Sequence, residues 1–282
     1  MLRVLVMGLW ESVAAMPSEI ANALLGVFKG ILVAFLQPML EAVKVMVTAN
    51  INPYDFQNLW QVVVSVISLF YVLIFILVGL KFLLGSYDAV HRAEAKEWFK
   101  DAIVLVIAVN ASLLIYSLLL SISSAVSLTL WNSDLEKIFD AQNLDALNII
   151  WIGMFAFSAL LAGFSLVIRQ LFLIAGVMLF PAGIALYLVR PLRFYGSFIL
   201  NFIMLAVFMQ VIDVIILIAL NLVSAQFSSV QSIGLLSMSV GLVLIAVVNV
   251  IAFFLSLLNA MLSALKQNPA VGMVAKAVVG VL

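Results

Sequence analysis

Long apolar runs and short polar islands follow one another along this chain. Four runs are long enough to cross a bilayer, whose hydrocarbon core of about 30 Å needs about 20 helical residues. They lie at Phe56–Leu84, Ala102–Trp131, Phe194–Val223 and Gly234–Leu262, and a fifth begins at Asn148 and extends to Ile168. Within each run the apolar residues are continuous rather than alternating. The pattern therefore predicts helices, which satisfy their own backbone hydrogen bonds in lipid.

The end of the fifth run is ambiguous. Another apolar stretch, Leu171–Val189, follows the single charge at Arg169. If this stretch crosses the bilayer, the chain has six core spans. If it dips in and returns, bent near Pro181 and Gly183, the chain has five.

The distribution of basic residues favours five spans. With five, the following residues share one side of the membrane: Arg92, Lys96, Lys100, Arg169, Arg190, Arg193, Lys266 and Lys276. Cytoplasmic loops carry an excess of Lys and Arg. We therefore predict an all-α polytopic membrane protein with about five transmembrane helices, a re-entrant or broken segment at 169–190 and a cytoplasmic C-terminus.

Residues 1–50 differ from the rest of the chain. Polar or small residues recur there with the spacing of one helical face, at Asn22, Gly26, Lys29, Gln37, Glu41, Lys44 and Thr48. Because charges are costly in lipid, we predict an amphipathic helix that lies on the outer membrane face or packs in an oligomer. The alternative, that residues 20–48 span the membrane, stays open. A turn at Asn50–Asp55 separates this region from a transmembrane core, 51–265, and a cytoplasmic tail, 266–282.

Composition agrees with a membrane protein. Hydrophobic residues make up 67% of the chain and charged residues 9%, whereas soluble domains carry about 25% charged residues. We therefore place the protein in the cell membrane (inner or plasma membrane) as a multi-pass protein.

The formal net charge is zero, so no global field attracts nucleic acid. The chain has no cysteine and only one histidine, His91, which excludes disulfides and thiolate metal sites, and we expect no cofactor.

Asp213 is the most informative single residue. It lies near the middle of Phe194–Val223, where an ionised carboxylate costs on the order of 3 kcal/mol. Gln210 and Asn221 lie on a neighbouring face of the same helix, and Asn249 lies at similar depth in the next span. Asp213 is either a pore-lining or relay carboxylate, or a protonated acid that holds two helices together through a partner such as Asn249. We find no basic residue at matching depth, so we expect no ion pair.

The polar island Ser86–Asp101 is the second candidate for function. Read as a helix, it places Arg92, Lys96 and Lys100 on one stripe and Glu94, Glu97 and Asp101 on another. Like charges four residues apart are mildly unfavourable, which favours a partner for the basic stripe: lipid headgroups, an acidic protein surface or a nucleic-acid backbone. The alternative is a solvated elbow whose charges only fix topology.

Two segments carry a resemblance to a known family. One combines a span, a short charged helix and a span rich in small residues: GLKFLLGSYDAVHRAEAKEWFKDAIVLVIAVNASLLIYSLLLSISSAV. The other places a proline in an apolar stretch before paired arginines and a glycine: LFPAGIALYLVRPLRFYGSFILNFIML. Over roughly residues 55–265 the chain resembles the TrbL-like polytopic inner-membrane channel component of conjugation and type IV secretion systems, and within it the archaeal Ced-type DNA import membrane proteins.

The resemblance implies a channel or scaffold subunit of a conjugation-like DNA transfer apparatus, for DNA import or exchange between cells. It implies a homo-oligomeric ring of about five copies, with a cytoplasmic conjugation-type ATPase, pilus subunits and single-stranded DNA as partners. A basic collar at the cytoplasmic mouth would then consist of Arg92, Lys96, Lys100, Arg190 and Arg193.

A second hypothesis comes from another class of protein. A small-molecule or ion transporter would use Asp213 as an intramembrane coupling carboxylate. We do not expect an enzyme, because the chain has no GxSxG or HExxH motif and no paired intramembrane aspartates.

Overall fold

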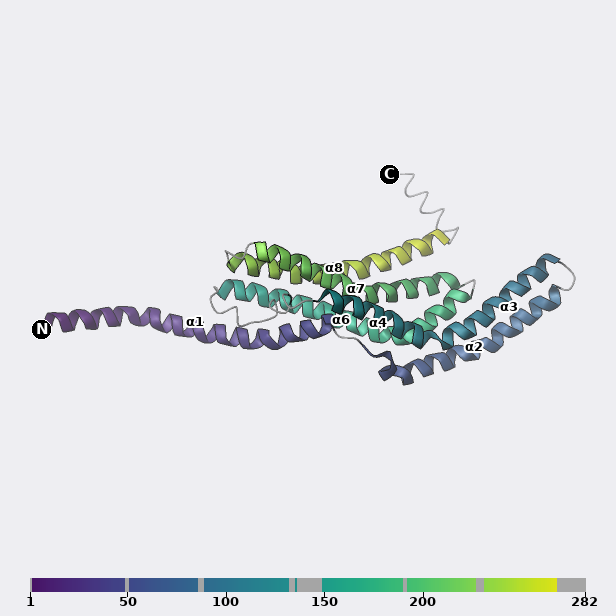
Figure 1. The fold of residues 1–282 in the computed structure, drawn as a ribbon, viewed down its shortest axis with the longest axis horizontal. Helices are drawn as coiled ribbons and strands as arrows, with labels where there is room; N and C mark the ends of the chain where they lie inside the picture. The colour runs from purple at the N-terminus through teal and green to yellow at the C-terminus, as the bar shows by residue number, and fades with distance from the viewer. Residues whose placement is uncertain are drawn as a thin grey trace, which may run out of the picture. The chain divides into compact units, whose positions relative to one another are not determined.

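The structure is a computed structural model that describes residues 2–48, 51–85, 89–131, 135, 149–189, 192–226 and 231–267. All regular elements in these ranges are helices (Figure 1): α1 (Leu2–Thr48), the 3-10 helix η1 (Pro53–Phe56), α2 (Gln57–Leu84), α3 (Ala89–Asn110), α4 (Ser112–Leu130), α6 (Ile149–Leu188), α7 (Arg193–Gln226) and α8 (Gln231–Gln267). Among the described residues, six helices are long and apolar enough to cross a membrane. The predicted all-α polytopic membrane fold is confirmed.

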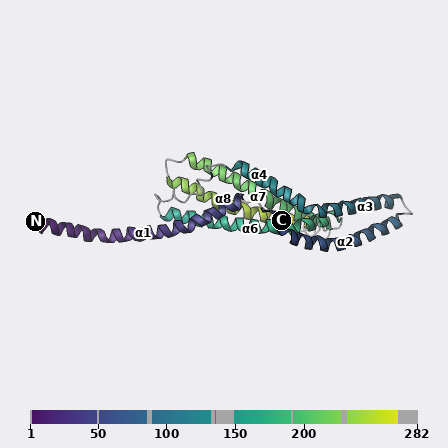
Figure 2. The same cartoon turned by 60° about the horizontal axis from the view of Figure 1, so that its bottom comes forward.

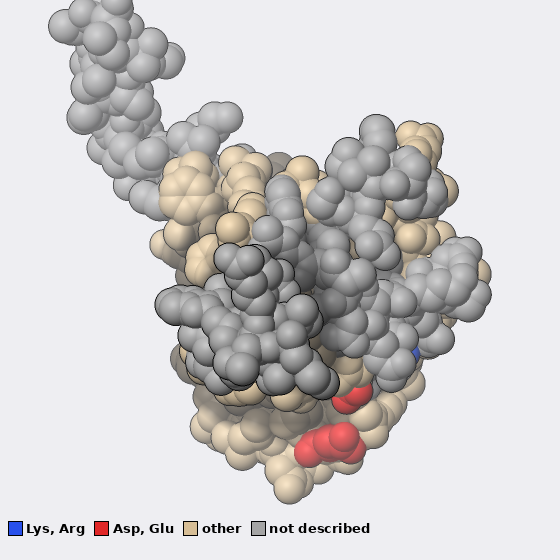
Figure 3. All heavy atoms as spheres, turned by 90° about the vertical axis from the view of Figure 1, so that its left-hand side faces the viewer, with Lys and Arg blue, Asp and Glu red and all other residues tan. Residues whose placement is uncertain are grey.

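The described surface is mostly apolar. Large hydrophobic side chains are exposed on the surface of every candidate span. Leu69 of α2, for example, is 74% exposed, and Phe164 of α6 is 68% exposed. In Figure 3 most of the described part of the visible face is uncharged, apart from acidic side chains in its lower part. Contiguous apolar surface on this scale is not compatible with water. The solvent around these helices is therefore lipid.

The prediction that the helix is broken or re-entrant at 169–190 is wrong. The stretch 171–188 is neither a separate crossing nor a re-entrant hairpin, because α6 runs unbroken from Ile149 to Leu188 with Pro181 inside it. A proline is tolerated within membrane helices where neighbouring groups satisfy the carbonyl that it frees. At 40 residues, α6 is about 60 Å long. The five core spans are thus in α2, α4, α6, α7 and α8, and α1 supplies the sixth candidate.

The charged island and the span after it also differ from expectation. Helix α3 begins at Ala89, so the charged residues belong to the same helix as the first apolar residues of the predicted span Ala102–Trp131. The span is interrupted only locally at Ala111, between α3 and α4, because Ala111 still makes helical backbone hydrogen bonds with Ile107 and Ile115. The side-chain amide of Asn110 donates to the carbonyl of Val106 at 2.7 Å beside it. Helices α2 and α3 lie side by side as an antiparallel hairpin (Figures 1 and 2).

A polar clamp near the tip closes this hairpin. The ammonium of Lys81 on α2 lies 2.5 Å from the carboxylate of Glu94 on α3 and 4.2 Å from the centre of the Trp98 ring. The rings of Phe82 and Phe99 meet edge to face beside it, 6.2 Å apart. The combination of an ion pair, a cation–π contact and an aromatic pair fixes α3 against α2.

The chain divides into two compact units. Unit 1 comprises residues 1–46, 132–164 and 216–246. In it, the last turns of α1 bury Leu36, Leu40 and Val43, while Gln37 donates to the exposed Glu41 at 3.3 Å on another face. These turns are amphipathic, and Gly26–Thr48 also qualifies as a candidate span. The position of α1 relative to the membrane therefore stays a prediction.

Unit 2 comprises residues 47–131, 165–215 and 247–282 and contains the larger core. Apolar side chains of α3 and α4 pack there against those of α6 and α7. The hydroxyl of Tyr116 on α4 donates to the carbonyl of Leu173 at 2.6 Å, and that of Ser123 donates to the carbonyl of Val207 at 2.6 Å. Gly176 leaves the space that the Tyr116 ring fills, since a Cβ there would overlap the phenol oxygen. These contacts hold α6 and α7 in place for the polar site between them.

Candidate functional site

A buried polar triad lies within unit 2. The guanidinium of Arg169 on α6 donates through Nη1 to Oδ2 of Asp213 on α7. The amide of Asn249 on α8 donates through Nδ2 to Oδ1 of the same carboxylate at 3.0 Å. The exposed fractions of these residues are 0%, 0% and 1%. Each residue lies close to the middle of its helix, so the three longest core helices meet at one carboxylate.

The triad is explained by the cost of charge in a low-dielectric interior. An isolated ion at this depth would be strongly unfavourable, and an intramembrane charge is therefore almost always paired. The carboxylate of Asp213 has both oxygens engaged by protein donors. Removal of one partner would leave the other charge buried and uncompensated. The pair thus fixes how far α6 can slide along α7, and the hydrogen bond from Asn249 fixes α8 relative to α7 in the same way.

Gln210 extends the polar contacts by one turn of α7. Its side-chain amide is buried and donates to the carbonyl of Val47 at 2.9 Å. Val47 lies in the last turn of α1, where carbonyls have no partner within the helix. Gln210 therefore caps the end of α1. Asn221, the fourth predicted intramembrane polar residue, lies further along α7 and is half-buried.

Two sequence-based expectations about charge are corrected here. The conclusion that no basic residue lies at the depth of Asp213 is wrong, because Arg169 pairs with it. The placement of Arg169 on one face of the membrane is wrong for the same reason. The hydrogen bond between Asn249 and Asp213 belongs to one of the two alternatives that the sequence left open, although that alternative had the acid protonated and without an ionic partner. One signal could have identified Arg169: it is the only charge in the apolar segment 149–189 and lies at its centre.

The basic residues of the predicted collar lie on two elements of unit 2. Arg92, Lys96 and Lys100 are exposed on α3, as is His91. Arg193 is exposed at the start of α7, where its guanidinium lies 4.7 Å from the centre of the Tyr187 ring and donates to the Tyr187 hydroxyl at 3.0 Å. Arg190, the fifth collar residue, lies outside the described residues.

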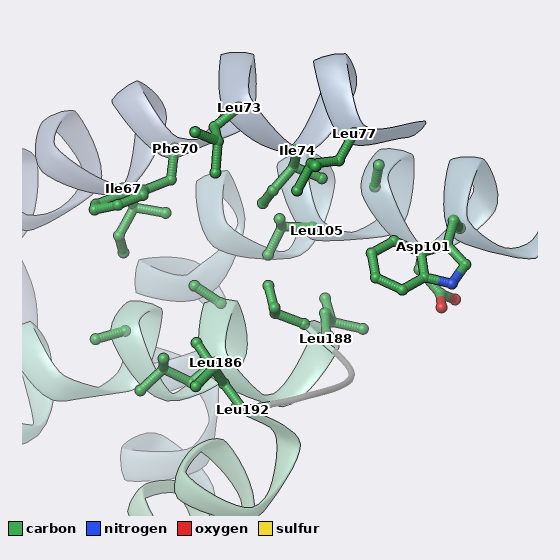
Figure 4. Close-up of a pocket in the computed structure, with 15 residues that line it drawn as sticks. Ile67, Phe70, Leu73, Ile74, Leu77, Asp101, Leu105, Leu186, Leu188 and Leu192 are labelled. Carbon is green, nitrogen blue, oxygen red and sulfur yellow. The ribbon is translucent and has the colours of Figure 1, made fainter. Parts of the chain in front are cut away.

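The turn from α6 to α7 is tightly constrained. A Cβ at Gly196 would overlap the backbone of Tyr187, so only glycine allows α7 to begin this close to α6. Leu192 in this turn and Asp101 on α3 line the same cavity of about 520 Å³ (Figure 4). Figure 1 also shows the α6–α7 turn and the α2–α3 hairpin on the same side of unit 2.

Metal chemistry has no support from the described residues, since no three of their His, Asp and Glu side chains gather where they could hold a metal ion. No protein-family model, curated protein or solved structure matches this chain.

The first prediction concerns the triad. We expect Asp213→Ala to destabilise the protein by about 3–5 kcal/mol, because it leaves the Arg169 guanidinium buried without its counter-ion. Asn249→Ala should cost less, about 1.5–3 kcal/mol, since one hydrogen bond to the carboxylate is lost while the ion pair remains. Unfolding in bicelles measures both values. Asp55→Ala, which removes an exposed carboxylate, serves as the control and should change stability by less than about 0.5 kcal/mol. Equal effects of Asp213→Ala and Asp55→Ala would contradict the assignment.

The second prediction concerns sidedness. The chain has no cysteine, so single cysteines at Arg92 and Arg193 can be labelled without background. Since α3 and the α6–α7 turn share one end of unit 2, a membrane-impermeant maleimide should reach both positions from the same side. Labelling in intact cells and in inverted vesicles measures this. Labelling of the two positions from opposite sides would contradict the arrangement.

Proposed function

We propose that this chain is a channel or scaffold subunit of a conjugation-like DNA transfer apparatus in the cell membrane, with its C-terminus in the cytoplasm. The observation that carries the proposal is the exposed basic row on α3. Arg92, Lys96 and Lys100 follow one another at four-residue spacing on a helix, and all three are exposed. Such a row matches a phosphate backbone or the acidic surface of a motor ATPase.

The hairpin geometry supports this role. Lys81 of α2 engages Glu94 of α3, so this acid is paired across the hairpin. The clamp also holds the row on a rigid support, which lowers the entropy lost when a partner binds. Arg193 at the same end of unit 2 extends the row toward the α6–α7 turn.

The polar triad supports assembly from several copies. Its charges are sealed within one protomer, so Asp213 does not present a free carboxylate to a lumen. A path wide enough for single-stranded DNA would then lie between protomers, in a ring of about five copies. This arrangement also avoids an anionic ring along the path, which would repel DNA.

The transporter hypothesis receives less support. A coupling carboxylate must exchange its partners for a proton or cation during transport. Both oxygens of Asp213 are held by side chains of the same protomer, and the residue is fully buried. These contacts are those of a structural site, so we adopt the DNA transfer role.

The third prediction tests the proposed function. Deletion of the protein should abolish DNA transfer between cells without affecting growth. Complementation with the triple variant Arg92→Gln, Lys96→Gln, Lys100→Gln should give a DNA transfer frequency roughly tenfold below that of the wild type. The loss of three cations removes three phosphate contacts. The matched control, Arg92→Lys, Lys96→Arg, Lys100→Arg, keeps the charge and should restore transfer fully. Unchanged transfer in the deletion strain, or full rescue by the neutral variant at equal expression, would refute the proposal.

A further inference from the structure

A large apolar cavity lies within unit 2, between the α2–α3 hairpin and the end of α6. Its volume is about 520 Å³, and its walls are almost wholly aliphatic and aromatic. Figure 4 shows Ile67 at one end and Asp101 at the other, with Leu77 and Leu105 between them. Among the described residues that line it, Asp101 is the only charged one. The cavity is separate from the polar triad and from the basic row.

A cavity of this kind needs an apolar occupant. Its volume falls in the range of about 300–1,000 Å³ that is typical of ligand sites. Water does not fill apolar cavities, because it finds no hydrogen-bond partners there. An empty void of this size would also forfeit the dispersion contacts that close-packed interiors make.

Shape and position identify the class of occupant. The cavity borders α2 and α6, which both qualify as membrane spans, so the surrounding solvent is hydrocarbon. Along α2 it extends from Ile67 to Leu77, a distance of about 15 Å at 1.5 Å per residue. An elongated apolar cavity that borders the bilayer fits an extended hydrocarbon chain, whereas a whole partner helix is about 10 Å wide.

The polar end of the cavity gives the occupant a direction. Asp101 marks this end in Figure 4, and Trp98, one turn earlier on α3, also lines the cavity. Tryptophan is enriched where membrane helices reach the headgroup region. Lys96 and Lys100, which flank this turn of α3, are exposed. The opposite end, at Ile67, is apolar.

We propose that the cavity holds one hydrocarbon tail of a membrane phospholipid, with the headgroup at the Asp101 end. The tail fills the space between α2 and α6 and joins the hairpin to the α6–α7 turn. The site does not depend on the proposed function, since the argument for it uses only the cavity, its lining and its position beside the membrane spans.

The fourth prediction tests the site with Trp98 as a fluorescent reporter. The other four tryptophans are replaced by phenylalanine, and dibrominated phosphatidylcholine is titrated into the full-length protein in detergent, up to and beyond an equimolar ratio. Bromine quenches tryptophan only at short range. We expect quenching that saturates at one lipid per chain, and stronger quenching by bromines near the headgroup than by bromines near the tail end.

Matched variants make the test specific. Ala185→Phe fills the cavity and should abolish quenching, and Ala182→Phe fills it from the preceding turn of α6 in case the first variant does not fold. Ala125→Phe adds the same bulk on the exposed face of α4 and should leave quenching unchanged. Native mass spectrometry of the otherwise unaltered chain should retain one phospholipid per protomer, lost in Ala182→Phe.

Three outcomes would overturn the proposal. The first is no quenching at an equimolar ratio, together with no retained lipid. The second is quenching that survives both cavity-filling variants. The third is a dimer that excludes added lipid, which would mean that a second copy of the chain fills the cavity. Stronger quenching by tail-end bromines would overturn the proposed direction.

Discussion

A guanidinium and a carboxylate that face each other in the middle of apolar helices restrict how those helices can pack. Arg169 and Asp213 are both fully buried, so neither charge can be satisfied by water. A displacement of α6 along α7 by one turn would separate them by about 5.4 Å and leave two buried charges apart. Aliphatic ridges alone would tolerate several registers at similar cost. The ion pair selects one of them, and Asn249 extends the selection to α8.

This constraint places functional chemistry at the periphery of the protomer. The charges at the centre are sealed, whereas those on α3 are exposed on a hairpin fixed by the Lys81–Glu94 pair. The apolar cavity lies between that hairpin and the α6–α7 turn. The central contacts thus leave two features for binding at the periphery. One is the exposed basic row, which is proposed to bind a charged partner, and the other is the cavity, which is proposed to bind a lipid tail.

Much of the fold could be predicted from the sequence, because membrane spans follow from continuous apolar runs. The hydrogen bond between Asn249 and Asp213 was also predictable, since both residues lie at mid-depth in consecutive spans. Arg169 was missed because a single charge within a long apolar segment can mark either the end of a span or a buried partner. The choice between the two depends on whether the helix continues through Pro181, and that depends on tertiary contacts. The cavity arises from the packing of several helices, which no local pattern contains.

The most direct test of this account is a double-mutant cycle on the central ion pair, with stability measured as the free energy of unfolding in bicelles. Arg169→Leu and Asp213→Leu should each destabilise the protein strongly, because each leaves one buried charge alone. The double variant removes both charges and should recover most of that loss, with a coupling energy of at least about 2 kcal/mol. Losses that simply add in the double variant would show that the two residues do not hold each other, and would contradict the account.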